Sequence, residues 1–152
     1  MKQLDIAQNR SVKNYSRKEI VLRILWGLGK IIFKSTPRIA FPFRNSILRL
    51  FGAKIGKHVH IYPSAVITYP WNLKIDEFSA IGESALIYNL GSVEIGKRST
   101  ISQNSHLCAG THDYADHSMP LIKGNIKIEN DVWICADAFI GGCLGEVQKV
   151  PI

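Results

Sequence analysis

The stretch that decides the fold runs from residue 55 to residue 107 and opens with Ile55-Gly56-Lys57-His58-Val59. Aliphatic residues recur in it at steps of six, in groups whose first members stand twenty positions apart. The groups are Ile55, Ile61, Ile67 and Leu73; Ile75, Ile81, Ile87 and Val93; and Ile95, Ile101 and Leu107. Six is a multiple neither of the helical 3.6 nor of a simple hairpin spacing, so amphipathic helices and a β-meander do not explain the pattern.

A six-residue step is typical of β-helix repeats. Three hexads would form one triangular coil with the aliphatic side chains inside, and the two extra residues in every twenty would form a bulge at one corner. Successive coils would stack about 4.8 Å apart, and each would bury its core only against its neighbours. Glycines 56, 82 and 96 would relieve tight corners. We therefore predict an all-β solenoid over residues 54–145, the alternative being chance spacing in a two-sheet β protein.

The ladder of aliphatic residues is interrupted once, and this interruption is where we expect function. It breaks after Leu107 and resumes with Ile126, Ile128, Ile134 and Ile140. The loop 108–125 contains Thr111-His112-Asp113-Tyr114, whose side chains could project from the coil wall into a cleft. After Gly141 the pattern is lost, so residues 146–152 are predicted to be the short tail of a truncated solenoid.

Residues 1–53 are predicted to be a basic, mainly helical segment. Residues 1–15 should be irregular, and Ser16-Arg17-Lys18-Glu19 is a capping box that starts a helix ending at Thr36-Pro37. A second short helix is expected from Arg44 to Phe51, closed by Gly52. These helices would cover one open end of the solenoid. A compatible alternative is that residues 16–51 also rest on an anionic membrane surface.

The charge is divided unevenly along the chain. Residues 1–60 hold 13 Lys and Arg against Asp5 and Glu19, a net charge of +11, whereas residues 61–152 hold 6 basic and 10 acidic residues. Zinc-finger spacings, aromatic ribonucleoprotein motifs and basic zippers are missing, so no nucleic-acid partner is expected. Three cysteines without a C-x-x-C pair indicate reduced thiols. Without a signal-peptide run, we expect a cytoplasmic protein, or a peripheral one at the inner face of the membrane.

Six short motifs make the sequence resemble the hexapeptide-repeat acyltransferases, and among them the colanic acid and exopolysaccharide O-acetyltransferases, related to galactoside and maltose acetyltransferases. The motifs are Tyr69-Pro70-Trp71-Asn72-Leu73, Ile87-Tyr88-Asn89-Leu90-Gly91, Ile101-Ser102-Gln103, Thr111-His112-Asp113-Tyr114, Pro120-Leu121-Ile122 and Val132-Trp133-Ile134. The resemblance implies a left-handed parallel β-helix and a homotrimer. It also implies acetyl transfer from acetyl-CoA to a hydroxyl of a sugar or lipid-linked saccharide, with no metal.

Acetyl transfer to an alcohol needs a base and donors for the developing oxyanion. By resemblance, His112 is the general base, Asn89 contacts the acceptor, and Trp133 lines the coenzyme A channel. The backbone N–H of Ala136 matches the oxyanion donor. Asp113 is a second candidate for the acceptor site, and either Asp113 or Asp116 could orient the imidazole.

Several alternatives remain open from the sequence. Asn89 could be a corner-turn residue, and Trp133 could pack on the wall. A zinc site of the γ-carbonic-anhydrase type could use His112 and His117, yet the chain has no third His between His60 and His106. A truncated, inactive or structural relative of such an acetyltransferase is the alternative from another class.

Overall fold

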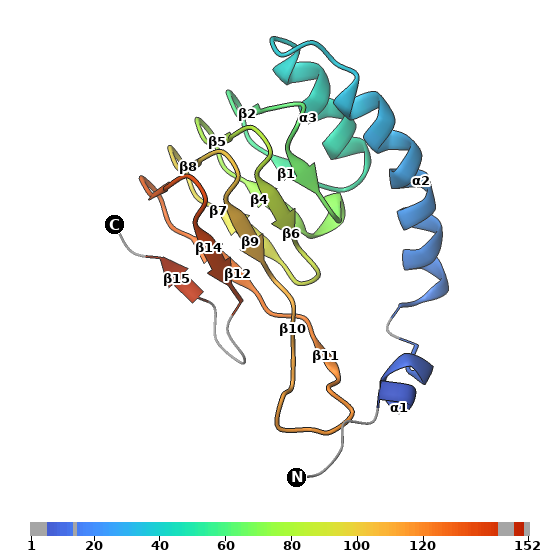
Figure 1. Cartoon of the computed structure of the whole chain (residues 1–152). Helices are drawn as coiled ribbons and strands as arrows, with labels where there is room; N and C mark the ends of the chain where they lie inside the picture. Colours follow the sequence, from blue (N-terminus) through green and yellow to red (C-terminus); the bar gives the residue numbers. More distant parts are fainter. Residues whose placement is uncertain (1–5, 14, 143–147, 151–152) are drawn as a thin grey trace.

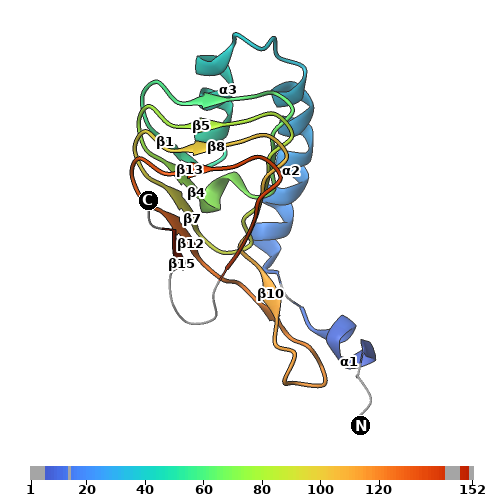
Figure 2. The ribbon, with the colours of Figure 1, turned by 60° about the vertical axis from the view of Figure 1, so that its left-hand side comes forward.

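A computed structural model describes residues 6–13, 15–142 and 148–150, and it shows helices followed by a three-sided stack of coils (Figure 1, Figure 2). The helices are α1 (Ile6–Ser11), α2 (Arg17–Lys34) and α3 (Phe41–Leu50), with a short 3-10 turn at Pro70–Asn72. The strands are β1 (Lys54–Ile55), β2 (His60–Ile61), β3 (Val66–Ile67), β4 (Leu73–Ile75), β5 (Ala80–Ile81), β6 (Leu86–Tyr88), β7 (Val93–Ile95), β8 (Thr100–Ile101), β9 (His106–Cys108), β10 (Thr111–His112), β11 (Leu121–Ile122), β12 (Ile126–Ile128), β13 (Trp133–Ile134), β14 (Phe139–Gly141) and β15 (Gln148–Val150).

Three parallel sheets form the faces of the solenoid. Their strand orders are β1-β4-β7-β12-β15, β2-β5-β8-β13 and β3-β6-β9-β14. Ile55 pairs with Ile75, and Ile75 pairs with Ile95, so one coil takes twenty residues. Ile95 then pairs with Ile128, 33 positions further on, because the loop is inserted in that coil. The predicted parallel β-helix and its single interruption are therefore confirmed.

The glycines that follow ladder residues, such as Gly56 and Gly82, do not form the tight turns that the sequence predicted for them. A Cβ on Gly56 or Gly82 would lie 2.6 or 2.8 Å from a backbone nitrogen of the next coil, which is too close. The left-handed turn itself falls two residues later, where His58 and Ser84 have φ values of 54° and 56°. Glycine is thus needed for the close approach of neighbouring coils rather than for the turn.

Helix α2 begins as its sequence predicts and packs on the coils through an aromatic cluster. The Ser16 hydroxyl accepts a hydrogen bond from the Glu19 N–H at 3.2 Å, and the Glu19 carboxylate accepts one from the Ser16 N–H at 2.8 Å. Trp26 and Phe33 are buried, with ring centroids 6.2 Å apart, and Trp26 also contacts the Phe51 ring at 5.0 Å. The predicted helix and its capping box are confirmed.

Three expectations need correction. Residues 6–11 form helix α1 and are not irregular. Helix α3 begins at Phe41 rather than Arg44. Backbone N–H groups in the first turn of a helix have no partner within the helix, and Pro42, which has no N–H, is therefore well suited to this turn. The aliphatic pattern is lost after Gly141, but strand β15 pairs in parallel with β12 and so extends the first sheet. The boundary expected at 145/146 and the thiol of Cys143 lie outside the described residues.

The first coil leaves a set of carbonyl groups without partners from the solenoid. Within the stack, a ladder carbonyl accepts from the coil before it, as the Ile75 carbonyl does from the Gly56 N–H at 2.7 Å. The carbonyls of Ile55, Ile61 and Ile67 have no earlier coil to pair with. An unsatisfied buried carbonyl costs free energy comparable to a lost hydrogen bond. The open end therefore needs donors from outside the solenoid.

Side chains of α2 and α3 supply these donors. The pairs are Arg49 Nη2 to Ile55 O at 2.9 Å, Arg44 Nε to Ile61 O at 2.8 Å, Trp26 Nε1 to Ile67 O at 2.9 Å and Asn45 Nδ2 to Val59 O at 2.8 Å. The helices thus cover the open end, as expected, and they do so by completing its backbone hydrogen bonds.

Arg44 is the most demanding of these donors, because its side chain is fully buried. Its guanidinium also donates to the Thr36 hydroxyl at 2.8 Å and the Pro37 carbonyl at 2.6 Å, and burial lowers its pKa. Arg44→Met should lower the free energy of unfolding by about 2–4 kcal/mol in urea titrations, since it leaves several buried acceptors unsatisfied. Arg38→Met, at an exposed side chain, is the control and should leave the midpoint nearly unchanged. Equal, small shifts for both variants would contradict the capping role.

Candidate active site

The loop that interrupts the ladder is a hairpin. The chain leaves the coil after β9, and β10 and β11 pair antiparallel, with Thr111 opposite Ile122 and His112 opposite Leu121. This hairpin projects from the stack, and helix α1 lies beside its tip (Figure 1, Figure 2). His112 is exposed on β10. The candidate base therefore stands outside the coil wall, as the sequence suggested.

The imidazole of His112 is held through one nitrogen. Its Nδ1 lies 2.7 Å from the Met119 carbonyl oxygen. A carbonyl oxygen can only accept a hydrogen bond, so the proton of the neutral ring must be on Nδ1. The lone pair is then on Nε2, the nitrogen that faces away from this contact. A ring in this tautomer is suited to accept a proton at Nε2.

A tight turn presents the Met119 carbonyl. Met119 has φ of 43°, and its N–H donates to the Asp116 carbonyl at 2.9 Å. The Asp116 carboxylate accepts from the Ser118 N–H at 2.8 Å and from the Ser118 hydroxyl at 2.9 Å. The backbone hydrogen bond from Ser118 is the main reason that the pKa of Asp116 is lowered. Asp116 therefore stabilises the turn and does not contact the ring directly.

Asp113 has a comparable local role. Its carboxylate accepts a hydrogen bond from the Ala115 N–H at 3.0 Å, and its own N–H donates to the Pro120 carbonyl at 3.1 Å. The sequence suggested that Asp113 or Asp116 orients the imidazole. This is wrong, because the group that contacts the His112 ring is the Met119 carbonyl. Contact of Asp113 with the acceptor stays a prediction.

Asn89 lies inside the solenoid wall. Its side chain is fully buried, its Oδ1 accepts from the Tyr69 N–H at 2.9 Å, and its Nδ2 donates to the Tyr69 carbonyl at 2.6 Å. Both ends of the amide are thus used by the preceding coil. This geometry favours the corner-turn alternative, and acceptor binding by Asn89 stays a prediction.

Trp133 lies on another face of the solenoid. Its side chain is 74% exposed, and its Nε1 donates to the Ser102 hydroxyl at 2.7 Å. It lines an open hollow of about 490 Å³ together with Tyr62, Gln103 and other residues of this face, and with Arg38 from the segment between α2 and α3. His112 is not among the described residues that line this hollow. Ala136, the expected oxyanion donor, follows β13 in an exposed turn. Within one copy of the chain, Trp133 and His112 therefore do not line the same hollow.

The N-terminal segment braces the hairpin, which sequence reasoning missed. Asn9 Nδ2 of α1 donates to the carbonyls of Ser118 and Met119, at 2.6 Å each. The ammonium of Lys123, just after β11, lies 3.4 Å from the Glu19 carboxylate of α2. These partners are 104 to 110 positions apart in the chain. A single sequence gives no signal for such pairs.

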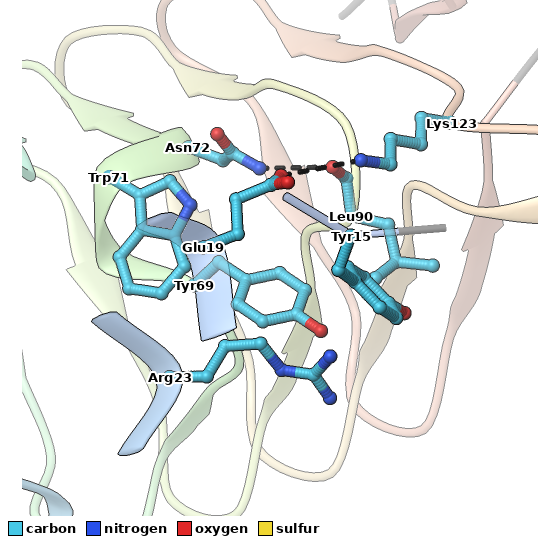
Figure 3. A pocket seen from close by; sticks show the side chains of 8 residues that line it. All are labelled: Tyr15, Glu19, Arg23, Tyr69, Trp71, Asn72, Leu90 and Lys123. Atoms are coloured by element: carbon cyan, nitrogen blue, oxygen red, sulfur yellow. Dashed lines mark hydrogen bonds and ion pairs between the residues drawn. The ribbon is translucent and has the colours of Figure 1, made fainter. Parts of the chain in front are cut away.

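A small cavity lies at the joint of α2 and the hairpin (Figure 3). Its lining residues are Tyr15, Glu19, Arg23, Tyr69, Trp71, Asn72, Leu90 and Lys123. The Arg23 guanidinium lies 4.2 Å from the Tyr15 ring centre, and burial, with the Tyr15 hydroxyl, raises the pKa of Tyr69 to about 12. The cavity volume is only about 10 Å³, the space of roughly one water. It is a structural joint and too small for a substrate.

Metal ligation is the alternative use of the exposed histidines. Across residues 6–13, 15–142 and 148–150, no three His, Cys, Asp or Glu side chains lie close enough to hold one ion. His112 and His117 are both exposed in the hairpin. Within one copy of the chain, the described residues offer no ready-made ligand set.

Comparison with known proteins gives close relatives in sequence. The chain is 40% identical over 121 residues to proposed colanic acid biosynthesis acetyltransferases named WcaF, from Escherichia coli strain K12 and from Shigella flexneri. The match covers 80% of this chain and 66% of each relative, so the chain spans slightly less than two thirds of their length. Protein-family models gave no match.

Solved structures share the fold at low sequence identity. A hexapeptide-repeat-containing acetyltransferase from Vibrio cholerae matches with a TM-score of 0.74 and 20% identity, over 84% of this chain and 73% of that one. A maltose O-acetyltransferase from Clostridium difficile 630 matches with a TM-score of 0.75 and 18% identity, over 92% and 78%. The predicted left-handed parallel β-helix is thereby confirmed. The chain is thus similar in sequence to the WcaF acetyltransferases, and it shares the solenoid fold of the solved hexapeptide-repeat acetyltransferase.

Proposed function

We propose that this chain is an O-acetyltransferase that moves acetyl from acetyl-CoA to a hydroxyl of a sugar in an exopolysaccharide precursor. The 40% identical relatives bear the name of colanic acid biosynthesis acetyltransferases, which supports both the transferred group and the class of acceptor. The observation that carries the proposal is the orientation of His112, whose Nδ1 is engaged by the Met119 carbonyl.

In the proposed reaction, Nε2 of His112 takes the proton of the acceptor hydroxyl as the oxygen attacks the thioester carbonyl. The imidazolium that forms is stabilised by its Nδ1–H bond to the Met119 carbonyl, which strengthens when the ring becomes charged. The tetrahedral intermediate then collapses, the C–S bond breaks, and the coenzyme A thiolate receives the proton from Nε2. The transfer is direct, with no acyl-cysteine intermediate.

The donor side of the site would lie on the Trp133 face. We propose that the exposed indole of Trp133 lines the coenzyme A channel and that the Ala136 N–H stabilises the oxyanion. The indole is fixed by its bond to Ser102, which suits a wall against which a ligand packs. Both ends of the Asn89 amide hold the Tyr69 corner, so Asn89 would support the acceptor side of the site through that corner.

Because His112 does not line the Trp133 hollow of its own copy, we propose that the site is completed between copies of a homotrimer. The hairpin of one copy would then reach the Trp133 face of the next. A cyclic arrangement repeats the same contact at each interface and gives equivalent sites.

Replacement of the proposed base should remove most of the activity. His112→Ala should lower kcat for acetyl transfer by about 10²–10⁴, the usual contribution of a general base, in an assay that follows release of the coenzyme A thiol. His117→Ala, in the same exposed hairpin, is the matched control and should turn over like the wild type. Equal turnover by His112→Ala and wild type, or no turnover by wild type on any sugar acceptor, would reject the proposal.

A shared site can be tested by mixing two inactive variants. His112→Ala and Trp133→Ala, each impaired alone, should recover up to about a quarter of wild-type turnover when unfolded and refolded together in equal amounts. This is the share of sites in a cyclic assembly that would receive both intact residues. Turnover of the mixture no higher than the mean of the two separate variants would show that each copy uses its own residues.

A further inference from the structure

The outer face of helix α2 is covered with exposed aliphatic side chains. The residues and their exposed fractions are Ile20 47%, Val21 56%, Ile24 65%, Leu25 47%, Leu28 62%, Ile31 64% and Ile32 56%. They recur at steps of three and four, which places them on one side of a helix, opposite the buried Trp26, Gly29 and Phe33. A helix that is apolar on both sides needs a partner on the second side as well as the first.

The charges beside this stripe are almost all positive. Helical periodicity places Lys18 along one flank of the stripe, and Arg23, Lys30 and Lys34 along the other. The single acidic residue of α2, Glu19, is turned to Lys123 of the hairpin. Burial lowers the pKa of Lys30, and the charges of Lys34 and Arg23 lower it further, which shows how closely the cations are grouped.

These charges discriminate between two kinds of partner. If a second copy of the chain covered the stripe, the cations of both helices would meet, and like charges across an interface oppose association. A surface of anionic lipid headgroups would neutralise them, while the aliphatic side chains entered the boundary of headgroups and acyl chains. None of the described helices is both long and apolar enough to cross a membrane, so contact would be lateral.

We propose that the outer face of α2 docks this protein on an anionic phospholipid surface. The helix would lie flat, with Ile24, Leu28 and Ile31 inserted and the flanking lysines at the level of the headgroups. The Glu19–Lys123 contact ties the first turn of α2 to the hairpin that carries His112. Docking would therefore hold the hairpin close to the surface, where a lipid-linked saccharide presents its sugar.

Vesicle co-sedimentation tests the docking face. The wild-type chain should sediment with vesicles of phosphatidylcholine containing about 30% phosphatidylglycerol, and not with phosphatidylcholine alone. Binding should fall in about 0.5 M NaCl, where exposed charges are screened within a few ångströms. The double variant Ile24→Asp/Leu28→Asp should weaken binding at least tenfold. Phe78→Asp is the control: Phe78 is a large exposed side chain on the solenoid, 59% exposed, and its φ of 61° is one that Asp tolerates.

Every outcome of this experiment bears on the proposal. Tenfold weaker binding by the double variant, with wild-type binding by Phe78→Asp and unchanged circular dichroism, supports it. No binding by the wild type, or equal binding by the double variant, overturns it. If the double variant instead loses the wild-type oligomeric state in light scattering and the wild type ignores vesicles, the stripe joins copies of the chain. Catalytic turnover does not enter the readout, so this result is separate from that for His112.

A second inference rests on a different contact, and it depends on the proposed function of His112. The Met119 carbonyl accepts two hydrogen bonds, from His112 Nδ1 at 2.7 Å and from Asn9 Nδ2 at 2.6 Å. The same Asn9 amide donates to the neighbouring Ser118 carbonyl. Both carbonyls of the turn are thus fixed by a residue more than a hundred positions away. We infer that Asn9 is a positioning residue, which holds the turn so that the Met119 carbonyl meets the imidazole.

Kinetics of Asn9 variants test this role. Asn9→Ala should lower kcat about three- to thirtyfold with an unchanged KM for acetyl-CoA. Asn9→Asp should be no better, because a carboxylate has the same shape but donates nothing to the two carbonyls. Arg10→Ala, at an exposed position on the same helix, is the control and should keep wild-type kinetics. Wild-type kcat for Asn9→Asp overturns the inference if His112→Ala is impaired, whereas wild-type kcat for His112→Ala overturns the proposed base itself.

Discussion

The structure depends on one requirement: the carbonyl groups at the open end of a parallel stack must find donors. In each later coil, the ladder carbonyls accept hydrogen bonds from N–H groups of the coil before it, but no coil precedes the first one. Arg44, Arg49 and Trp26 replace that missing coil with three side-chain donors. The N-terminal helices are therefore a necessary end of the solenoid, in the way that repeat proteins need a terminal cap.

This cap fixes the orientation of α2, and two consequences follow from it. Trp26 turns one side of the helix to the coils, which leaves the aliphatic stripe on the other side exposed. The helix also begins beside the hairpin, where Glu19 meets Lys123, while α1 reaches the tip through Asn9. The N-terminal segment that completes the backbone hydrogen bonds thus also places groups that brace the hairpin of the candidate base.

The solenoid could be predicted from the sequence because its inner face needs an aliphatic side chain every six residues. The ladder residues that meet this need are recognisable by residue type and are buried in the structure. The contacts of the candidate site could not. The partner of His112 is the backbone carbonyl of Met119, and a carbonyl carries no residue-type signal. Asp113 and Asp116 are carboxylates close to His112 in the sequence, yet both accept hydrogen bonds within local turns. For Asn89 the sequence allowed both a corner and a site residue, and its burial and its two bonds to Tyr69 favour the corner.

The contacts between α2 and the hairpin fix the position of the hairpin and add little to the free energy of folding. The side chains of the Lys123–Glu19 pair are 40% and 35% exposed, and such pairs contribute little to stability. The cavity beside it has space for about one water, and the Arg23 guanidinium packs over the Tyr15 ring at this joint. A rigid helix seated by buried donors can therefore hold the hairpin at a constant height above whatever its outer face rests on. A soluble sugar acceptor would gain nothing from this arrangement, whereas an acceptor confined to a surface would be presented to His112 at a fixed depth.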